Sequence, residues 1–220
     1  MTADEKRLLR DAARRFDVEP RTETLARIER YLELLAVWNH RLRLTGERDP
    51  SRLIERHVAD SLAPVRHLPS RGLVVDVGSG AGFPGIILAC VCPDLEVVLV
   101  DSRRKPIAFL CDAIRSVPLP HARAVAARAE DAATDPELAG RAAVVVSRAI
   151  RADVFVTLAA AFLAPSGRAI AMQTPRTAGT ATNAAERQGL ALVGRDDYSL
   201  PGAGTRSLLI FGRDDARRVS

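Results

Sequence analysis

A glycine-rich turn between two acidic residues is the part of this sequence best suited to chemistry. Residues 76–82 read Asp-x-Gly-x-Gly-x-Gly and follow a stretch of apolar residues. A strand that turns sharply into a helix needs glycine at such a point, because only glycine lets a ligand lie directly against the backbone. A second acid, Asp101, ends the next apolar stretch, where a carboxylate is placed to bind ribose hydroxyls. The spacing therefore predicts a ligand that contains a nucleoside.

Two classes of cofactor fit such a turn. Residues 80–85 read Gly-x-Gly-x-x-Gly, the fingerprint of dinucleotide-binding enzymes, but a single match of that kind is weak. The form that begins with Asp76 is typical of methyltransferases, where the carboxylate organises the turn and reaches the methionine end of the ligand. A nicotinamide enzyme also needs hydride-transfer residues, and neither Tyr31 nor Tyr198 has a lysine four residues later. We therefore predict S-adenosyl-L-methionine as the cofactor.

The elements that must position this turn alternate between helices and short apolar strands. Buried strands are expected at residues 73–77, 96–100, 122–126, 143–146 and 168–172. Helical stretches lie near residues 84–91, 103–116, 134–139, 152–163 and 177–189. This alternation predicts a doubly wound α/β fold, in which right-handed crossovers build a parallel sheet.

The end of the chain departs from this alternation. Two strand-like stretches, residues 190–198 and 206–211, are joined by a short loop that contains Pro201 and Gly202. Strands joined in this way form a hairpin, so the last strand is expected to enter the sheet antiparallel. Plain dinucleotide-binding folds do not usually finish like this, whereas class I (Rossmann-like) methyltransferases do. Residues 71–220 are therefore expected to form an S-adenosylmethionine-binding Rossmann-like methyltransferase domain.

The first 70 residues have a purely helical pattern. A short amphipathic helix is expected at residues 4–16, and apolar residues recur at steps of three and four from Leu25 to Leu42. Asp49 followed by Pro50 is typical of another helix start. Residues 1–70 are therefore expected to form an N-terminal helical cap on the methyltransferase domain.

The charge of the chain suits a nucleic-acid partner. The formal net charge is +5, and Lys6 and Lys105 are the only lysines among 32 basic residues. Arginine binds phosphates bidentately, but a coding bias toward alanine and arginine would give the same composition. Charge alone therefore supports an RNA substrate only weakly.

No targeting, membrane or metal signal is found in the sequence. No segment reaches the roughly 18 uninterrupted apolar residues of a membrane span, and the charged N-terminus leads into no apolar signal region. Three cysteines do not make a disulfide framework, and Cys90 and Cys92 have no nearby histidine, so we expect small core residues there rather than metal ligands. We expect a soluble cytoplasmic protein, a monomer without a metal.

Several further motifs extend over residues 25–212. They are Trp38-Asn39, Leu44-Thr45, Arg56-His57-x-x-Asp60-Ser61-Leu62, the extended turn Asp76-Val77-Gly78-Ser79-Gly80-Ala81-Gly82-Phe83-Pro84-Gly85, Asp101-Ser102-x-x-Lys105, Phe109-Leu110, Arg128-Ala129-Glu130 and Ser147-Arg148-Ala149. In this combination the chain resembles the RsmG (also called GidB) family, the small-subunit (16S) ribosomal RNA guanine-N7 methyltransferases. The resemblance implies a class I methyltransferase that acts on small-subunit rRNA or on an assembling ribosomal subunit.

The resemblance also implies roles for individual residues. Around the cofactor it places Asp76, Gly78, Gly80 and Phe83 in the turn, Asp101 on the ribose, Ala129 and Glu130 at the adenine, and Arg148 at the methionine end or the incoming base. Arg148 is the expected catalytic residue, because it ends a buried strand at the carboxyl edge, where such sheets bind ligands. Glu130 is alternatively an acid that favours the start of a helix.

The implied reaction needs little chemical apparatus. Guanine N7 carries a free lone pair, so attack on a sulfonium methyl group needs no general base, and positioning and electrostatics suffice. The chain accordingly has no Asp/Asn-Pro-Pro-aromatic motif for exocyclic amines and no Pro-Cys nucleophile for pyrimidine carbon.

Some positions depart from the family pattern. Residues 172–175 read Met-Gln-Thr-Pro where the family has Lys-Gly, and Arg176 is a candidate for the lost cation. Arg206 is all that remains of a Glu-Arg-His motif, and Arg43 and Pro106 are also unusual. These changes leave two alternatives open: a paralogue that methylates another RNA or a small molecule, and a nucleic-acid-binding protein without turnover.

Three smaller questions are also left to the structure. His57 and Asp60 lie three apart on one helical face and either touch RNA or brace the cap against the sheet. Trp38 is expected in the core rather than as a platform for a base. The pairs Arg14-Arg15 and Arg103-Arg104 are both expected on solvated faces, and the second pair, beside Asp101, is the better candidate for phosphate binding.

Overall fold

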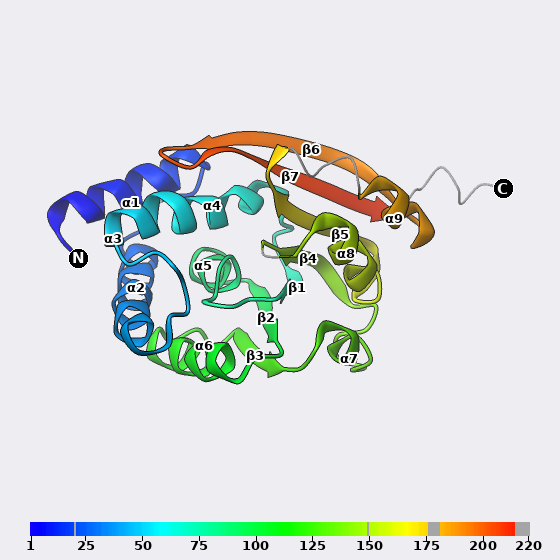
Figure 1. Ribbon diagram of the computed structural model, residues 1–220, viewed down its shortest axis with the longest axis horizontal. Helices are drawn as coiled ribbons and strands as arrows, with labels where there is room; N and C mark the ends of the chain where they lie inside the picture. Colours follow the sequence, from blue (N-terminus) through cyan, green and yellow to red (C-terminus); the bar gives the residue numbers. More distant parts are fainter. Residues whose placement is uncertain (20, 149, 176–180, 214–220) are drawn as a thin grey trace.

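The computed structural model describes residues 1–19, 21–148, 150–175 and 181–213, and its centre is one mixed sheet (Figure 1). The strands are β1 (Gly72–Val77), β2 (Leu95–Asp101), β3 (Ala122–Ala126), β4 (Ala142–Ser147), β5 (Leu163–Gln173), β6 (Leu190–Leu200) and β7 (Gly204–Arg213). They lie in the order β3-β2-β1-β4-β5-β7-β6. The pairs among β1 to β5 are parallel, whereas β7 is antiparallel to both β5 and β6. The predicted sheet with an antiparallel last strand is confirmed.

Helices cover both faces of this sheet, as the doubly wound pattern predicts. On one face lie α5 (Gly85–Val91) and α6 (Arg104–Ser116), and on the other α7 (Ala129–Ala132), α8 (Ala152–Ala159) and α9 (Thr182–Arg187). Buried side chains alternate along β1: Val74 packs in the core on the side of α5 and α6, and Val75 packs in the core on the side of α7, α8 and α9. This period of two is what buries a strand on both sides.

The first 67 residues form the helices that the sequence predicts. They are α1 (Ala3–Arg15), α2 (Thr22–Leu42), α3 (Pro50–Leu53), a π-helical turn (Ile54–Val58), α4 (Ala59–Leu62) and a 3₁₀ turn (Ala63–His67). Thr2 and Glu5 form a capping box at the start of α1. The Asp49 carboxylate caps α3 by accepting from two backbone N–H groups. The helix start predicted at Asp49 and Pro50 is therefore confirmed.

These N-terminal helices share one apolar core with a face of the sheet. The rings of Tyr31 and Phe83 meet edge to face at 5.5 Å, and Phe109 of α6 lies 6.1 Å from Tyr31. Trp38 packs on Phe109 and donates its indole N–H to Asp112 at 2.9 Å, which confirms that it belongs to the core. The division of the chain at residue 70 stays a prediction.

Two elements differ from the predicted ones. Residues 134–139 form turns rather than a helix, because Pro136 has no N–H and Asp135 instead binds the backbone N–H of Glu137 through its side chain. The short helix α7 lies earlier, directly after β3. The helix predicted at residues 177–189 is α9, and residues 177–180 lie outside the described part.

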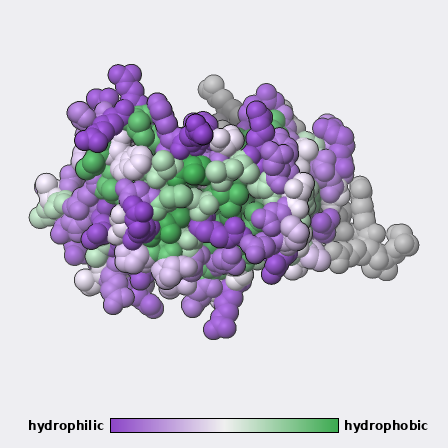
Figure 2. Space-filling view, turned by 90° about the horizontal axis from the view of Figure 1, so that it is seen from below, coloured by the Kyte–Doolittle hydropathy of each residue, from purple (hydrophilic) through white to green (hydrophobic). Residues whose placement is uncertain are grey.

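One face of the molecule carries apolar surface surrounded by hydrophilic side chains (Figure 2). Figure 2 shows the side of the molecule on which β3, α6 and α7 lie, with apolar surface in the middle of the face and hydrophilic side chains around it. In the part of the chain that the structure describes, no helix has the length and apolar character needed to span a membrane. Cys90 is fully buried in the core and Cys92 packs against it, as the sequence predicts.

Candidate active site

The glycine turn connects β1 to α5 and depends on backbone conformations that only glycine adopts easily. Gly78, Gly80 and Gly82 have φ angles of 76°, 58° and 95°. A β-carbon on Gly82 would lie 2.7 Å from the side chain of Ile86. The N–H groups of Gly78 and Ser79 both donate to the carbonyl of Val100 at the end of β2. The turn is therefore fixed to the neighbouring strand, and a side chain would be strained at all three glycines and would also clash at Gly82.

Asp76 stabilises the turn by joining the end of β1 to the start of α5. Its carboxylate is fully buried and accepts the backbone N–H of Gly85, the first residue of α5, at 3.0 Å. A β-carbon on Gly85 would lie 2.6 Å from the same oxygen, so glycine is required there as well. Burial raises the pKa of Asp76 to about 7. Asp76 thus organises the turn, as expected, whereas its contact with the methionine end of a ligand stays a prediction.

A cavity of about 360 Å³ opens beside the turn, at the carboxyl ends of β1 and β2. Four of the predicted site residues line it: Gly78, Asp101, Ala129 and Glu130. These residues come from three separate segments, and the fold brings them together at the switch point of the sheet, where such folds bind ligands. Phe83, Asp76, Gly80 and Arg148 are not among the residues that line the cavity.

Asp101 is buried at the end of β2, although it lines this cavity. The residue is only 4% exposed, and its two oxygens accept four N–H groups. One donor is the backbone of Gly80, and the other three belong to Arg103. Burial acts to raise the pKa of Asp101, but the hydrogen bonds and charge of Arg103 outweigh it and hold the pKa below its ordinary value. Asp101 is therefore a carboxylate near neutral pH.

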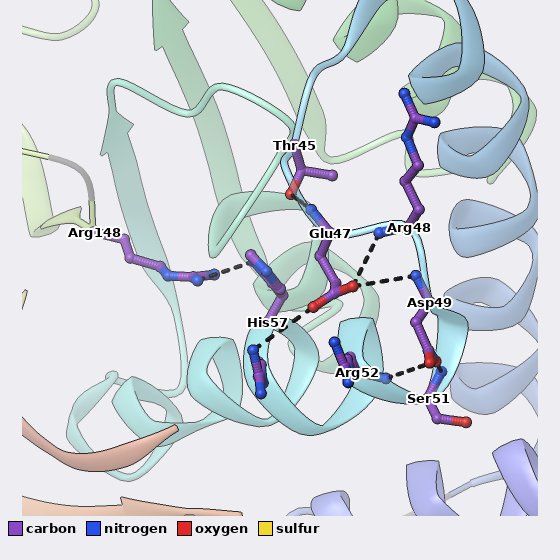
Figure 3. A network of polar contacts seen from close by, with 9 residues as sticks. Thr45, Glu47, Arg48, Asp49, Ser51, Arg52, His57 and Arg148 are labelled. Carbon is purple, nitrogen blue, oxygen red and sulfur yellow. Dashed lines mark hydrogen bonds and ion pairs between the residues drawn. The ribbon is translucent and has the colours of Figure 1, made fainter. Parts of the chain in front are cut away.

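Arg148 follows β4 and is held by two residues of the N-terminal helices. Its Nε lies 2.9 Å from a carboxylate oxygen of Asp60, and its Nη2 lies 2.9 Å from Nδ1 of His57 (Figure 3). Burial and the nearby charge of Arg148 lower the pKa of His57 to about 4. His57 is therefore a neutral imidazole near pH 7, and its Nδ1 accepts the hydrogen bond from Arg148.

A third contact ties this group to the C-terminal hairpin. The Tyr198 hydroxyl of β6 donates to the second oxygen of Asp60 at 2.6 Å. Asp60 is only 2% exposed, and burial raises the pKa of Tyr198 well above its ordinary value. We call His57, Asp60, Arg148 and Tyr198 the arginine clamp. Of the two uses left open for His57 and Asp60, the structure supports bracing.

Tyr198 is the functional candidate that sequence reasoning missed. The sequence identified it only as a tyrosine without the lysine of a dehydrogenase, and no local pattern joins it to Asp60. His57 gave a weak signal through its spacing from Asp60. His57 lies in the π-helical turn Ile54–Val58 and Asp60 in the following helix α4, and π-helical turns are frequent at functional sites.

The loop before α3 positions His57 and explains two of the sequence motifs. The Asn39 side chain accepts the N–H of Thr45 and donates to the carbonyl of Glu47. The Glu47 carboxylate accepts the N–H groups of Arg48 and Asp49 and lies 3.7 Å from the guanidinium of Arg56 (Figure 3). Asn39 and Thr45 therefore hold the loop that leads into the helix of His57.

Three buried side-chain atoms have no hydrogen-bond partner among the described residues: Asp76 Oδ1, Ser147 Oγ and Arg148 Nη1. All three lie at the carboxyl ends of β1 and β4. Buried polar atoms are nearly always hydrogen-bonded, so an unsatisfied donor and acceptor at one edge of the sheet are suited to a ligand. A guanidinium donor and a carboxyl acceptor together match the carboxylate and ammonium of an amino-acid group.

Other predicted positions lie outside this arrangement. Arg176 falls outside the described residues, while Gln173 at the end of β5 donates to the carbonyl of Ile150. Arg206 faces Tyr198 across the hairpin. Arg104 is exposed, as expected, whereas Arg103 is ion-paired. Within the described ranges, no group of three or more histidine, cysteine or acidic side chains is placed to hold a metal ion.

The sequence is similar to that of one protein family over most of its length. The family described as rRNA small subunit methyltransferase G (GidB) matches residues 24–202. A relative from Anaeromyxobacter dehalogenans, named ribosomal RNA small subunit methyltransferase G, is 43% identical over 80% of this chain and 82% of its own length. A relative of the same name from a Geobacter species is 34% identical over 97% of this chain and its own full length.

Solved structures of methyltransferases have a similar fold. A TehB-like S-adenosylmethionine-dependent methyltransferase from Corynebacterium glutamicum gives a TM-score of 0.55 at 17% identity and covers 83% of this chain and 98% of that one. The 16S rRNA (adenine(1408)-N(1))-methyltransferase of Catenulisporales acidiphilia gives 0.55 at 18% identity and covers 66% of this chain and 87% of that one.

Proposed function

Because the chain belongs to the rRNA small subunit methyltransferase G family, we propose that it transfers a methyl group from S-adenosyl-L-methionine to N7 of a guanosine in small-subunit ribosomal RNA. One observation carries this proposal: a glycine turn, an acid and a clamped arginine meet at the carboxyl edge of the sheet. The first two suit a nucleoside cofactor, and the arginine lies at the end of the neighbouring strand.

The described residues fit the cofactor. The cavity beside Gly78 takes the nucleoside, with the ribose at Asp101 and the adenine at Ala129 and Glu130. The backbone N–H of Gly80 donates to Asp101 and so fixes the turn beside the proposed ribose site. The ring of Phe83 lies under Arg148, with 5.8 Å between the ring centre and the guanidinium carbon, and so connects the turn to the clamp. The unsatisfied Nη1 of Arg148 suits the methionine carboxylate, and the free oxygen of Asp76 suits its ammonium group.

The reaction requires position more than acid–base chemistry. When bound, the cofactor supplies an electrophilic methyl group on a sulfonium. Guanine N7 is neutral and carries its own lone pair, so no described residue has to take a proton. The Arg148 guanidinium is paired with the Asp60 carboxylate and His57 is a neutral imidazole, which makes the clamp a positioning group rather than a general base. Its role is to orient the reacting groups at the mouth of the site.

The proposed partner is small-subunit rRNA, alone or within an assembling subunit. The net charge of +5 supports an anionic partner. Arg56 and Arg206 supply positive charge near the clamp, since both lower the pKa of His57. We further propose that the protein acts as a cytoplasmic monomer without a metal, with residues 1–70 as the cap of a cofactor-binding domain at 71–220.

The proposal can be tested with purified components. The chain is incubated with S-adenosyl-L-methionine carrying a labelled methyl group and with either protein-free small-subunit rRNA or intact small subunits. Label that mass spectrometry locates in 7-methylguanosine supports the proposal. Label in another nucleoside would contradict N7 specificity, and transfer only to other RNA or small molecules would favour a paralogue. Cofactor binding without any transfer would favour the non-catalytic alternative.

A further inference from the structure

Arg103 forms hydrogen bonds to the carboxylate of Asp101, the group proposed to bind the ribose hydroxyls of the cofactor. Its guanidinium makes a two-point contact with Asp101, from Nε to one oxygen at 3.1 Å and from Nη2 to the other at 2.9 Å. Arg103 directly precedes α6, and its side chain is 67% exposed, whereas that of Asp101 is 3% exposed. Arg103 also lines the cavity proposed for the nucleoside. Solvent and ligands therefore meet Arg103 before they meet Asp101.

The hydrogen-bonding capacity of Asp101 is already filled. An ionised carboxylate has about four acceptor positions. One oxygen accepts the N–H and Nε–H of Arg103, and the other accepts the N–H of Gly80 and the Nη2–H of Arg103. A ribose that offers two hydroxyl donors can bind this carboxylate only if two of the four donors leave.

Only the guanidinium pair is free to leave. The N–H of Gly80 is fixed by the turn, which is itself bonded to β2 through Val100. The N–H of Arg103 is fixed at the start of α6. The guanidinium stands at the end of a flexible, largely exposed side chain, so it can rotate into solvent at small cost. Two side-chain donors would then be exchanged for two hydroxyl donors.

We propose that Arg103 guards the cofactor pocket: its guanidinium holds Asp101 while the pocket is empty and must be displaced by the two ribose hydroxyls when the cofactor binds. The inference rests on the proposed function, because it takes the cavity to be the S-adenosylmethionine site. Arg103 lowers the affinity for the cofactor, since part of the binding free energy is spent on breaking its ion pair. It also keeps a buried carboxylate paired when no ligand is present.

Three properties of ligand binding follow from this exchange. Removing the guanidinium strengthens binding of any ligand that carries both hydroxyls. Added salt weakens the exposed ion pair, so the advantage of a variant without the guanidinium shrinks as ionic strength rises. A ligand without the ribose hydroxyls makes no demand on Asp101 and is unaffected by the substitution.

The test is calorimetric titration of S-adenosylhomocysteine into the wild-type chain and three variants. Arg103→Ala is expected to bind roughly three- to tenfold more tightly, in line with the strength of exposed two-point ion pairs. Arg103→Lys is expected to gain less, because an ammonium keeps the charge but loses the fork. Arg104→Ala, which removes an equal charge from the exposed neighbouring position, is expected to leave the affinity unchanged.

A second ligand distinguishes displacement of the Arg103 guanidinium by the ribose hydroxyls from steric blocking of the pocket by the Arg103 side chain. With S-adenosylhomocysteine that lacks both ribose hydroxyls, Arg103→Ala and the wild type are expected to bind equally. An equal gain for both ligands would overturn the exchange, and so would unchanged or weaker binding of S-adenosylhomocysteine by folded Arg103→Ala. Binding by the wild type in either case leaves the proposed function standing. Failure of the wild type and of Arg104→Ala to bind S-adenosylhomocysteine at all would instead overturn the proposed function together with the inference.

Discussion

The glycine turn and the arginine clamp lie at the same edge of the sheet but are built in opposite ways. The turn comes from one continuous segment, residues 76–85, and its shape is set by backbone conformation and backbone hydrogen bonds. The clamp joins side chains from three distant segments, and its shape is set by charge and burial. A local pattern suffices to specify the first, whereas only the complete fold assembles the second.

This difference predicts different failures. A substitution in the turn changes the surface that is proposed to hold the cofactor, so it should abolish cofactor binding while the rest of the fold persists. A substitution in the clamp removes one of several hydrogen bonds or ion pairs that hold its side chains in place. It should reduce transfer or stability by an amount that depends on which contact is lost.

Gly78→Arg should abolish cofactor binding. Gly78 has a φ of 76° and lines the cavity, and a β-carbon there would lie 3.4 Å from Ile150, so an arginine adds backbone strain and fills the pocket. We expect the affinity for S-adenosylhomocysteine to fall by at least about 100-fold. Gly140→Arg is the matched control, because Gly140 has a φ of 67° and open space around it. An unchanged titration curve for Gly78→Arg would remove the turn from the site.

Arg148→Ala should reduce methyl transfer much more than it reduces cofactor binding. It removes the positive group at the mouth of the site, and loss of a positioned charged donor typically costs about 100- to 1,000-fold in rate. Single-turnover transfer to rRNA measures the rate, and titration of S-adenosylhomocysteine measures binding. Circular dichroism should show the folded chain, because the turn and both cores are untouched. Full transfer activity would exclude Arg148 from the active site.

Tyr198→Phe should destabilise the chain moderately and spare the cofactor turn. The substitution removes the hydrogen bond to buried Asp60 but keeps the ring that packs edge to face on Phe16. A hydrogen bond to a charged group contributes about 2 kcal/mol, which urea unfolding should detect. In an Asp60→Asn background the same substitution should cost clearly less. Equal costs in both backgrounds would mean that Tyr198 does not act through Asp60.

His57→Asn should change how stability depends on pH. Folded His57 stays neutral down to about pH 4, whereas an unfolded histidine takes up a proton near pH 6.5. The contribution of His57 to the free energy of unfolding is therefore complete above pH 6.5 and is lost as the pH falls toward 4. Asp76 acts in the opposite direction, since its pKa of about 7 in the folded chain favours stability at lower pH.

The free energies of unfolding at pH 5 and pH 7 test this prediction. Relative to the wild type, the change in the free energy of unfolding from pH 5 to pH 7 should be about 1 kcal/mol less favourable to folding in His57→Asn. His40→Asn, a change at an exposed histidine of α2, should match the wild type. The same pH dependence in all three chains would show that His57 is not held neutral by burial and Arg148.

The same contrast explains how much the sequence could predict. Gly78, Asp101, Ala129 and Glu130 were expected at one site, and they line one cavity, because the ends of parallel strands meet at one edge. Asp60 and Tyr198 lie far apart in the chain, and no spacing predicts their contact. Arg103 was expected on a solvated face beside Asp101, and its side chain is 67% exposed, but no spacing predicts the two hydrogen bonds from its guanidinium to Asp101. Contacts between side chains of distant elements depend on tertiary packing.

Mass-spectrometric mapping of 7-methylguanosine in cells tests the proposed methylation of small-subunit rRNA at guanine N7. Small-subunit rRNA is compared between cells with the gene for this chain, cells without it, and deletion cells that carry the wild type, Gly78→Arg or Gly140→Arg. We predict that one 7-methylguanosine disappears in the deletion, returns with the wild type and Gly140→Arg, and stays absent with Gly78→Arg. Persistence of every 7-methylguanosine in the deletion would contradict the account.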